Sequence, residues 1–206
     1  MKTATTYQTI AAATEALFKD RGSKFLAYAC PVHSVDEIKV HVAALKKLHP
    51  KAIHFCLAWK LGTEGNLFRA NDDGEPSGSA GKPILGQIES LGLTNTLVVV
   101  VRYWGGTLLG VPGLINAYKT AAADALKQAD IVVKNIEKTY TLSFDYTLQN
   151  EVMRILKQDH CTVQHTEQML FIEMKVGIPV AVEAGVVEKL KGLHQVKVSE
   201  GESMGK

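Results

Sequence analysis

A run of four valines constrains the fold of this 206-residue chain more than any other feature. The valines lie in the segment from Thr96 to Tyr103, which carries no polar residue between its first position and Arg102. β-Branched residues favour strands, and a strand without polar alternation is typically buried on both faces. Glycines follow, and then Leu114 to Ala129 shows the spacing of an alanine-rich helix. The pattern predicts a buried strand that feeds a glycine-rich turn and a helix.

The rest of the first 134 residues predicts further strands and helices. Ser34 and Glu37 have the spacing of a capping box at the start of a helix predicted over residues 35–49. The other elements expected are extended structure over 14–32 with a turn at 19–22, a strand over 52–61, a short helix from Pro83 and a short strand over 131–133. Residues 61–82 show no period and predict a long loop, which in a compact domain is often functional.

A second pattern begins near Asn135. Its predicted elements are a strand over 138–146, a helix over 148–158, strands over 161–166 and 169–176, a helix over 179–191 and a strand over 194–199. This βαββαβ order is a ferredoxin-like arrangement. We therefore expect an α+β chain with two domains, residues 1–134 and 135–206, and a frayed tail over 201–206.

Composition excludes several classes of protein. Hydrophobic residues make up 46% of the chain, enough for a core, so a wholly disordered chain is excluded. The longest apolar run, from Leu97 to Val101, is far shorter than the ~20 residues of a membrane span. The start of the chain lacks the apolar stretch of a secretory signal, and the three cysteines have no C-x-x-C spacing. We expect a cytoplasmic protein without disulfides, zinc or a membrane partner.

The charge is unevenly distributed along the chain. Residues 1–134 carry 15 Lys and Arg against 11 Asp and Glu, whereas residues 135–206 carry 8 against 10. A mildly basic first part is compatible with an anionic partner, and equally with an ordinary solvated surface of mixed charge.

Two segments are candidates for chemistry. The second along the chain, RYWGGTLLGVPGL, runs from Arg102 to Leu114. Its glycines would let a ligand approach the backbone, and the N-terminus of the following helix would attract an anion. Arg102 would bind phosphate. A glycine-rich packing turn explains the same pattern. The spacing differs from that of a dinucleotide-binding turn.

The first segment, DDGEPSGSAGKP, runs from Asp72 to Pro83. It resembles the end of a phosphate-binding P-loop, but Pro76 and Pro83 stand where that motif requires glycine and Ser or Thr. Its acidic residues are the type that binds Mg²⁺, yet turn formation explains them better, and we expect no metal. His54 and Cys56 share one strand face, where a buried thiol and a hydrogen-bonded imidazole are favoured over a nucleophile.

These two segments resemble the IMPACT/YigZ family. The family's D-D-G-E-P loop is matched over residues 72–83, and its R-Y-aromatic-G-G segment is matched over residues 102–114. A basic-Ser-basic-Phe element is matched by residues 21–25, and an H-x-C element by His54 and Cys56. Ser79 for the commoner Thr and Trp104 at the aromatic position are mild departures.

The resemblance implies a first domain that is a two-layer α/β sandwich similar to domain IV of elongation factor G. It implies a ferredoxin-like second domain similar to domain V of that factor. Both are modules that face RNA and the ribosome. The family's eukaryotic relatives restrain the amino-acid-starvation kinase pathway that controls translation initiation, using an additional N-terminal domain for which this chain has no room. Fold-level analogy of this kind is associational.

Three functions follow as hypotheses. The first, which we favour, is a cytoplasmic protein that binds RNA or the ribosome and takes part in translation regulation. The second is an enzyme or binder acting on a small phosphorylated or nucleotide ligand; the sequence leans against an enzyme and implies no cofactor. The third is a protein-interaction module in a stress or translation-control pathway, with acidic surfaces that meet a basic partner. Oligomeric state is left open.

The residues expected to bind a nucleic acid or another ligand come from both segments, the adjoining strands and the following helix. They are Lys24, His54, Asp72, Asp73, Gly74, Glu75, Gly78, Ser79, Gly81, Lys82, Arg102, Tyr103, Trp104, Gly105, Gly106, Gly110, Gly113 and Lys119.

Overall fold

A computed structural model describes residues 4–201 of the chain, so most of the expected frayed tail lies outside the described residues. The structure has α+β architecture, as expected, with three sheets and five α-helices in the described part. The chain divides into two compact units. The larger is Tyr7–Lys134, and the smaller contains the residues from Asn135 onward together with residues 4–6. Within residues 4–201 no helix is both long and apolar enough to cross a membrane.

An antiparallel five-stranded sheet forms the centre of the larger unit. Its strands, in spatial order, are β2 (Thr14–Asp20), β3 (Ser23–Pro31), β6 (Thr96–Tyr103), β4 (His54–Leu61) and β5 (Leu67–Asn71). The valine-rich strand β6 lies in the middle, as its lack of polar alternation predicts. Val98 and Val100 pack into one core, and Val99 and Val101 pack into another on the opposite face.

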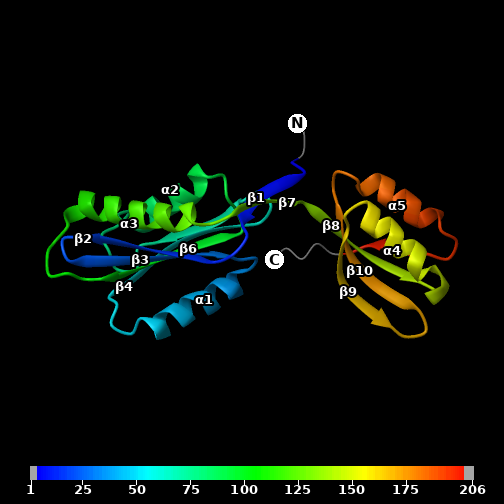
Figure 1. Ribbon diagram of the computed structural model, residues 1–206, viewed down its shortest axis with the longest axis horizontal. Helices are drawn as coiled ribbons and strands as arrows, with labels where there is room; N and C mark the ends of the chain where they lie inside the picture. The colour runs from blue at the N-terminus through cyan, green and yellow to red at the C-terminus, as the bar shows by residue number, and fades with distance from the viewer. Residues whose placement is uncertain (1–3, 202–206) are drawn as a thin grey trace. The chain divides into compact units, whose positions relative to one another are not determined.

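Helices cover both faces of this sheet (Figure 1). Helices α2 (Gly81–Ser90) and α3 (Gly110–Lys127) pack with Val98 and Val100, whereas α1 (Val35–Leu48) packs with Val99 and Val101. The expected two-layer sandwich is therefore extended by a third layer. Four alanines of α3, Ala117, Ala121, Ala122 and Ala125, are fully buried, which lets that helix lie close to the strands.

Three local features differ from the sequence-based expectation. Strand β5 lies inside the segment expected to be one long loop; its exposed edge position removes the alternation that would have indicated a strand. At the start of α1, Ser34 Oγ accepts a hydrogen bond from Glu37 N, as in a capping box, but the Glu37 carboxylate accepts from His33 N. A separate two-stranded sheet pairs β1 (Thr6–Ile10) with β7 (Ile131–Asn135), and β1 was not predicted.

The smaller unit is the predicted βαββαβ arrangement. Its elements are β8 (Glu137–Phe144), a short 3-10 turn η1 (Tyr146–Leu148), α4 (Gln149–Gln158), β9 (Thr162–Gln168), β10 (Ile172–Pro179), α5 (Glu183–Gly192) and β11 (Lys197–Glu200). The antiparallel sheet has the order β11-β8-β10-β9. Alternate residues of β8 and β10 pack with Val152, Ile155 and Leu156 of α4 and with Val186 and Leu190 of α5.

Candidate functional site

The family-like segments meet at one end of the five-stranded sheet. In the strand register, Arg102 at the end of β6 lies between Phe25 at the start of β3 and His54 at the start of β4, and Lys24 pairs with Tyr103. Because α2 and α3 follow strands that finish at this end, both helices begin here. The strand order thus brings together segments that are far apart in the sequence. No pattern in the sequence predicts this order.

Asp72 holds the acidic loop onto the start of α2. Its Oδ1 accepts hydrogen bonds from Ala80 N (3.0 Å) and Gly81 N (2.8 Å), and its Oδ2 accepts one from Gly78 N (2.9 Å). The helix has no capping side chain of its own, so this carboxylate occupies the anion-binding position at its N-terminus. Burial opposes ionisation, but the three N–H groups and nearby Lys82 lower the pKa of Asp72 overall. The α2 anion site is filled from within the protein.

Asp73 fastens the same loop to β4. Its Oδ2 accepts a hydrogen bond from Phe55 N at 2.7 Å, and its main-chain oxygen lies 2.7 Å from His54 Nδ1. A carbonyl oxygen only accepts, so His54 Nδ1 carries the proton and donates. Asp73 and Gly74 both have positive φ, which gives the loop its sharp turn toward His54. The two acidic side chains are therefore used in shaping the loop.

Glu75 lies at the centre of a buried polar cluster. Its Oε1 accepts hydrogen bonds from Arg102 Nη1 at 2.6 Å and from Tyr118 OH at 2.7 Å, and it lies 4.0 Å from His54 Nε2. The side chains of Glu75 and Arg102 are only 4% and 6% exposed. The Arg102 guanidinium also lies over the ring of Phe25, 5.5 Å from its centroid. Burial raises the pKa of the Tyr118 hydroxyl well above its usual range, so it remains a donor.

This arrangement changes the expected role of Arg102. The sequence placed it at the surface as a phosphate ligand, whereas in the structure it is buried and paired with Glu75. Its Nε is a buried side-chain nitrogen without a partner among the described residues. Strand parity gives the physical reason, since position 102 falls on the same sheet face as Val98 and Val100. Arg102 supports the site from beneath and is not positioned to bind a phosphate at the surface.

Cys56 is not activated as a nucleophile. Its Sγ donates to the main-chain oxygen of Asp72 at 3.0 Å, and burial raises the pKa of the thiol to about 12. A thiol with this pKa is almost entirely protonated at neutral pH. Among the described residues there is also no group of three or more His, Cys, Asp or Glu arranged to hold a metal ion.

Glycines of the second segment pack against the β2–β3 turn. A Cβ on Gly105 would lie 1.9 Å from the carbonyl carbon of Gly22, so no larger residue fits without moving the backbone. Gly105 N donates to Ser23 Oγ at 3.2 Å, and Arg21 Nη2 donates to Leu109 O at 3.1 Å. The packing interpretation of this glycine-rich turn therefore accounts for its closest contacts.

The start of α3 remains open to solvent. No side chain caps it, and its first turn contains no acidic residue. The preceding loop exposes Trp104 (56%) and Leu108 (83%). Within residues 4–201 no side chain caps this helix N-terminus, in contrast to α2, which Asp72 caps.

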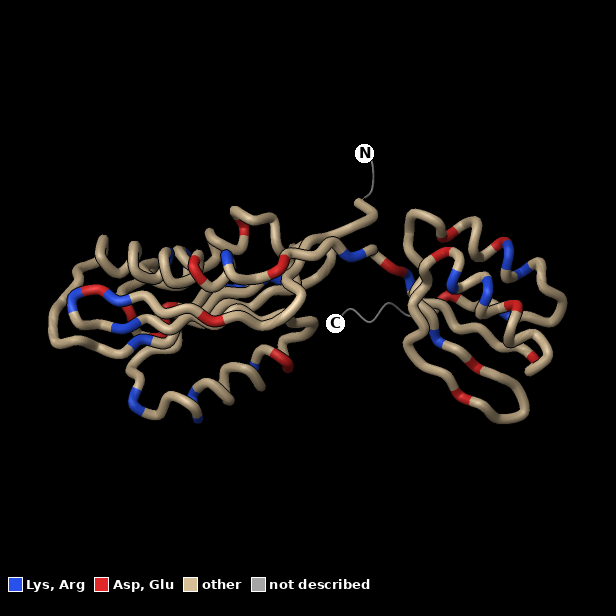
Figure 2. The backbone as a smooth tube through the Cα atoms, in the orientation of Figure 1, with Lys and Arg blue, Asp and Glu red and all other residues tan. Residues whose placement is uncertain are grey.

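Exposed cations gather at this same end of the unit. They come from the β2–β3 turn, from the end of α1 and the residues after it, and from the start of α2. Figure 2 shows blue residues in the turn and around the end of α1, both at this end of the larger unit. These residues are Lys19, Arg21, Lys24, Lys46, Lys47, Lys51 and Lys82.

The remaining predicted site residues vary in position. Tyr103 is half-buried, and its hydroxyl lies 3.0 Å from His49 Nδ1 on the α1 side of the sheet. Lys119 is exposed farther along α3. The backbone of Gly81 packs on Asn71, and Ser79 is buried with its hydroxyl donating to Pro76 O. The positions of Gly74, Gly106 and Gly110 are exposed, and those of Gly78 and Gly113 are half-buried.

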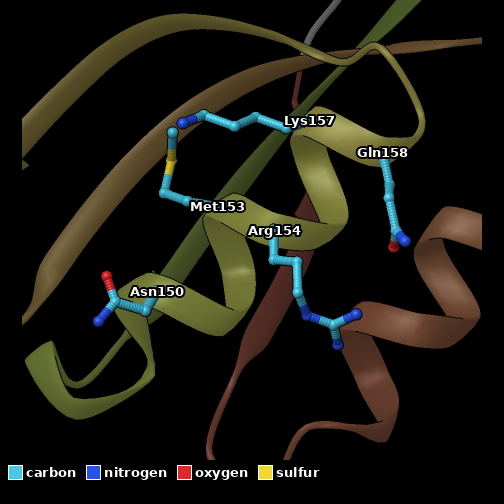
Figure 3. Close-up of a pocket in the computed structure, with 5 residues that line it drawn as sticks. All are labelled: Asn150, Met153, Arg154, Lys157 and Gln158. Atoms are coloured by element: carbon cyan, nitrogen blue, oxygen red, sulfur yellow. The ribbon is translucent and has the colours of Figure 1, made fainter.

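Sequence reasoning missed Tyr118 and Phe25 as parts of the polar cluster. Tyr118 lies on the apolar face of α3, and its lone hydroxyl on that face was the signal that a buried partner existed. A surface pocket of about 530 Å³ on α4 was also not expected. It contains none of the predicted site residues and is lined by Asn150, Met153, Arg154, Lys157 and Gln158 (Figure 3).

Comparisons with known proteins agree with the motifs. The family model described as the Impact N-terminal domain matches residues 21–126. The chain is 34% identical to the IMPACT family member YigZ of Escherichia coli, covering 82% of this chain and 83% of that protein. It is 34% identical to the IMPACT family member YvyE of Bacillus subtilis, covering 74% and 73%. To the Protein IMPACT of Rattus norvegicus it is 31% identical, covering 68% of this chain and 42% of that protein.

A solved structure supports the same conclusion. A crystal structure described as that of a hypothetical protein superposes with a TM-score of 0.75 at 29% identity, covering 98% of this chain and all of the other. These matches show that the chain belongs to the IMPACT family.

Proposed function

We propose that the chain binds RNA, free or within the ribosome, through the basic end of its larger unit, and that it acts in the cytoplasm in translation regulation. We further propose that residues 1–134 and 135–206 are separate functional domains. The observation that carries the proposal is the division of charge at this sheet end. The carboxylates of Asp72, Asp73 and Glu75 turn inward to protein donors, while the lysines and Arg21 are exposed.

Because the exposed charges are positive and the carboxylates are turned inward, this end of the sheet attracts anions. Phosphates are attracted by exposed Lys and Arg, and the affinity then falls as salt rises because counterions are released. The open N-terminus of α3 adds N–H donors. Trp104, in the loop before α3, is more than half exposed and offers a face on which an unpaired base can stack. A single-stranded or looped RNA uses all three features, whereas a regular duplex hides its base faces.

The same contacts argue against the enzyme alternative at this site. General base catalysis or Mg²⁺ binding requires carboxylate oxygens that are free to face a substrate or ion. Asp72 instead accepts three backbone hydrogen bonds, and Glu75 accepts from Arg102 and Tyr118. The carboxylates thus have structural partners, which supports a binding surface over a metal-dependent active site.

The test removes three exposed cations without touching the buried cluster. A Lys19→Ala, Lys24→Ala, Lys47→Ala variant is compared with the unmodified chain for binding to short single-stranded RNA across a salt titration. If all three lysines contact phosphates, the slope of log K against log salt decreases by about 2, at about 0.7 per contact. The affinity at low salt falls as well.

A matched control removes three exposed lysines from the smaller unit. Lys157→Ala, Lys191→Ala, Lys197→Ala makes the same change in net charge, and its binding should differ little from that of the unmodified chain. Equal losses in the two triple variants would mean that net charge alone drives binding and would remove the proposed site. Thermal unfolding of both variants checks that the fold is retained.

A further inference from the structure

The tip of the β9–β10 hairpin in the smaller unit exposes three consecutive large apolar side chains. Met169 is 74% exposed, Leu170 86% and Phe171 58%. Figure 1 shows this hairpin as the orange loop that joins the two strands. Single exposed apolar residues are ordinary, but three in a row on one turn form a patch that binding would bury. We call residues 169–171 the hairpin tip.

The hairpin tip is held in one conformation. Met169 N donates to Phe171 O at 3.1 Å across the turn, and Tyr146 OH donates to Met169 O at 2.8 Å from the neighbouring 3-10 turn. A preformed loop loses little conformational entropy on binding. These two hydrogen bonds restrain the tip while its side chains remain exposed to solvent.

Directly behind the tip, two acidic residues face each other across the hairpin. Glu167 on β9 pairs in register with Glu173 on β10. Like charges directly opposite each other on antiparallel strands are unfavourable. His165 Nε2 lies 3.1 Å from Glu167, while Glu173 has no ion-pair partner within residues 4–201. Lys175 and His165 form the next register pair on the same face, so one lysine already lies near the two carboxylates, and a further cation brought to them is favourable.

We propose that the hairpin tip docks onto a partner protein through a short segment in which apolar side chains are flanked by Lys and Arg. The apolar side chains of the tip and the segment pack together, and Glu167 and Glu173 meet the flanking Lys or Arg. Charge complementarity selects this partner over others. RNA phosphates and anionic lipid headgroups are repelled by the acidic pair, and a second copy docking tip to tip brings four carboxylates together.

This surface is distinct from the basic end proposed for RNA, and each can fail without the other. The test uses the full chain as bait for a library of random twelve-residue peptides displayed on phage. We expect enrichment of peptides in which Leu, Phe or Trp is flanked by Lys and Arg. The affinity of an enriched synthetic peptide is then measured against variants of the chain by fluorescence anisotropy.

Leu170→Asp should weaken peptide binding by about tenfold to a hundredfold, the effect of losing one buried leucine side chain. Glu167→Gln, Glu173→Gln should weaken it at low salt and remove most of its salt dependence. Leu108→Asp is the matched control, since Leu108 is 83% exposed in the larger unit, and it should leave the affinity unchanged.

Several results would overturn the proposal. Enrichment of acidic peptides, no enrichment, or equal losses for Leu170→Asp and Leu108→Asp would each exclude a basic partner at the hairpin tip. Light scattering that shows a Leu170-dependent dimer would assign the tip to a second copy. Leu170-dependent sedimentation with phosphatidylcholine–phosphatidylglycerol vesicles would assign it to a membrane. Circular dichroism of each variant establishes that the losses do not come from unfolding.

Discussion

Replacing Arg102 by methionine should strongly destabilise the larger unit. The change removes a positive charge but keeps a long apolar side chain over Phe25, so the lost volume is small. Glu75 then remains with its side chain only 4% exposed and retains Tyr118 as its hydrogen-bond donor. Breaking a buried ion pair from one side costs about 3–5 kcal/mol because the remaining charge is left unpaired in a poorly solvated place.

A double-mutant cycle separates the ion pair from other effects of the substitution. Glu75→Gln keeps the shape of the side chain and an oxygen for Tyr118, but removes the charge that Arg102 faces. The combined variant, Arg102→Met with Glu75→Gln, leaves no buried unpaired charge. Its loss of stability should be smaller than the sum of the single losses by about 2 kcal/mol or more, within the range seen for contacting residues.

Denaturant unfolding followed by tryptophan fluorescence measures these losses. Both tryptophans, Trp59 and Trp104, belong to the larger unit, and Trp59 is 6% exposed, so the signal reports on that unit. Arg69→Met, at an exposed position of β5, is the control and should change stability by no more than about 0.5 kcal/mol. A loss below about 1 kcal/mol for Arg102→Met, or additive single losses, would refute the buried pair.

Three further predictions follow from the site. Asp72→Ala should lower the free energy of unfolding by about 1–2 kcal/mol at neutral pH, because the α2 cap is lost. The pKa of Asp72 is lowered in the folded chain, so the unmodified chain should be more stable than Asp72→Asn by the full amount above pH 3.8, the ordinary pKa. This advantage should shrink as the pH is lowered below that value. Gly105→Ala should lower stability by about 1–3 kcal/mol in thermal unfolding, because its Cβ would meet Gly22 backbone, whereas Gly86→Ala, where a Cβ meets nothing within 4 Å, should be neutral or stabilising. Trp104→Ala should weaken single-stranded RNA binding by about 1–3 kcal/mol while Trp104→Phe retains most of it, and equal binding of all three chains would exclude stacking on this ring.

Features with strong local causes were predictable from the sequence. The unbroken valines of β6 indicated a strand covered on both faces, and the start of α1 followed from the capping-box spacing of Ser34 and Glu37. The βαββαβ order of the smaller unit followed from the succession of strand-like and helix-like periods in its hydrophobic residues. Strand β5 was missed because an exposed edge strand carries little hydrophobic pattern.

The interior of the candidate site was less predictable. Composition suggests that an arginine at a strand end faces solvent, and only strand parity together with the buried Tyr118 indicates that Arg102 points inward. The burial of Glu75 depends on a loop path set by Asp72 and Asp73, whose partners lie on other elements. The hairpin tip had no sequence signal beyond a short apolar run, which predicted part of a strand and not an exposed turn.

Equilibrium binding of the unmodified full chain to short single-stranded RNA, measured from about 50 to 200 mM salt, tests the central claim most directly. The account predicts binding at low salt with a slope of about −2 or steeper, as expected when at least three of the exposed cations contact phosphates. Absence of binding at the lowest salt, or an affinity that does not change with salt, would contradict the proposal that the basic end of the larger unit binds RNA.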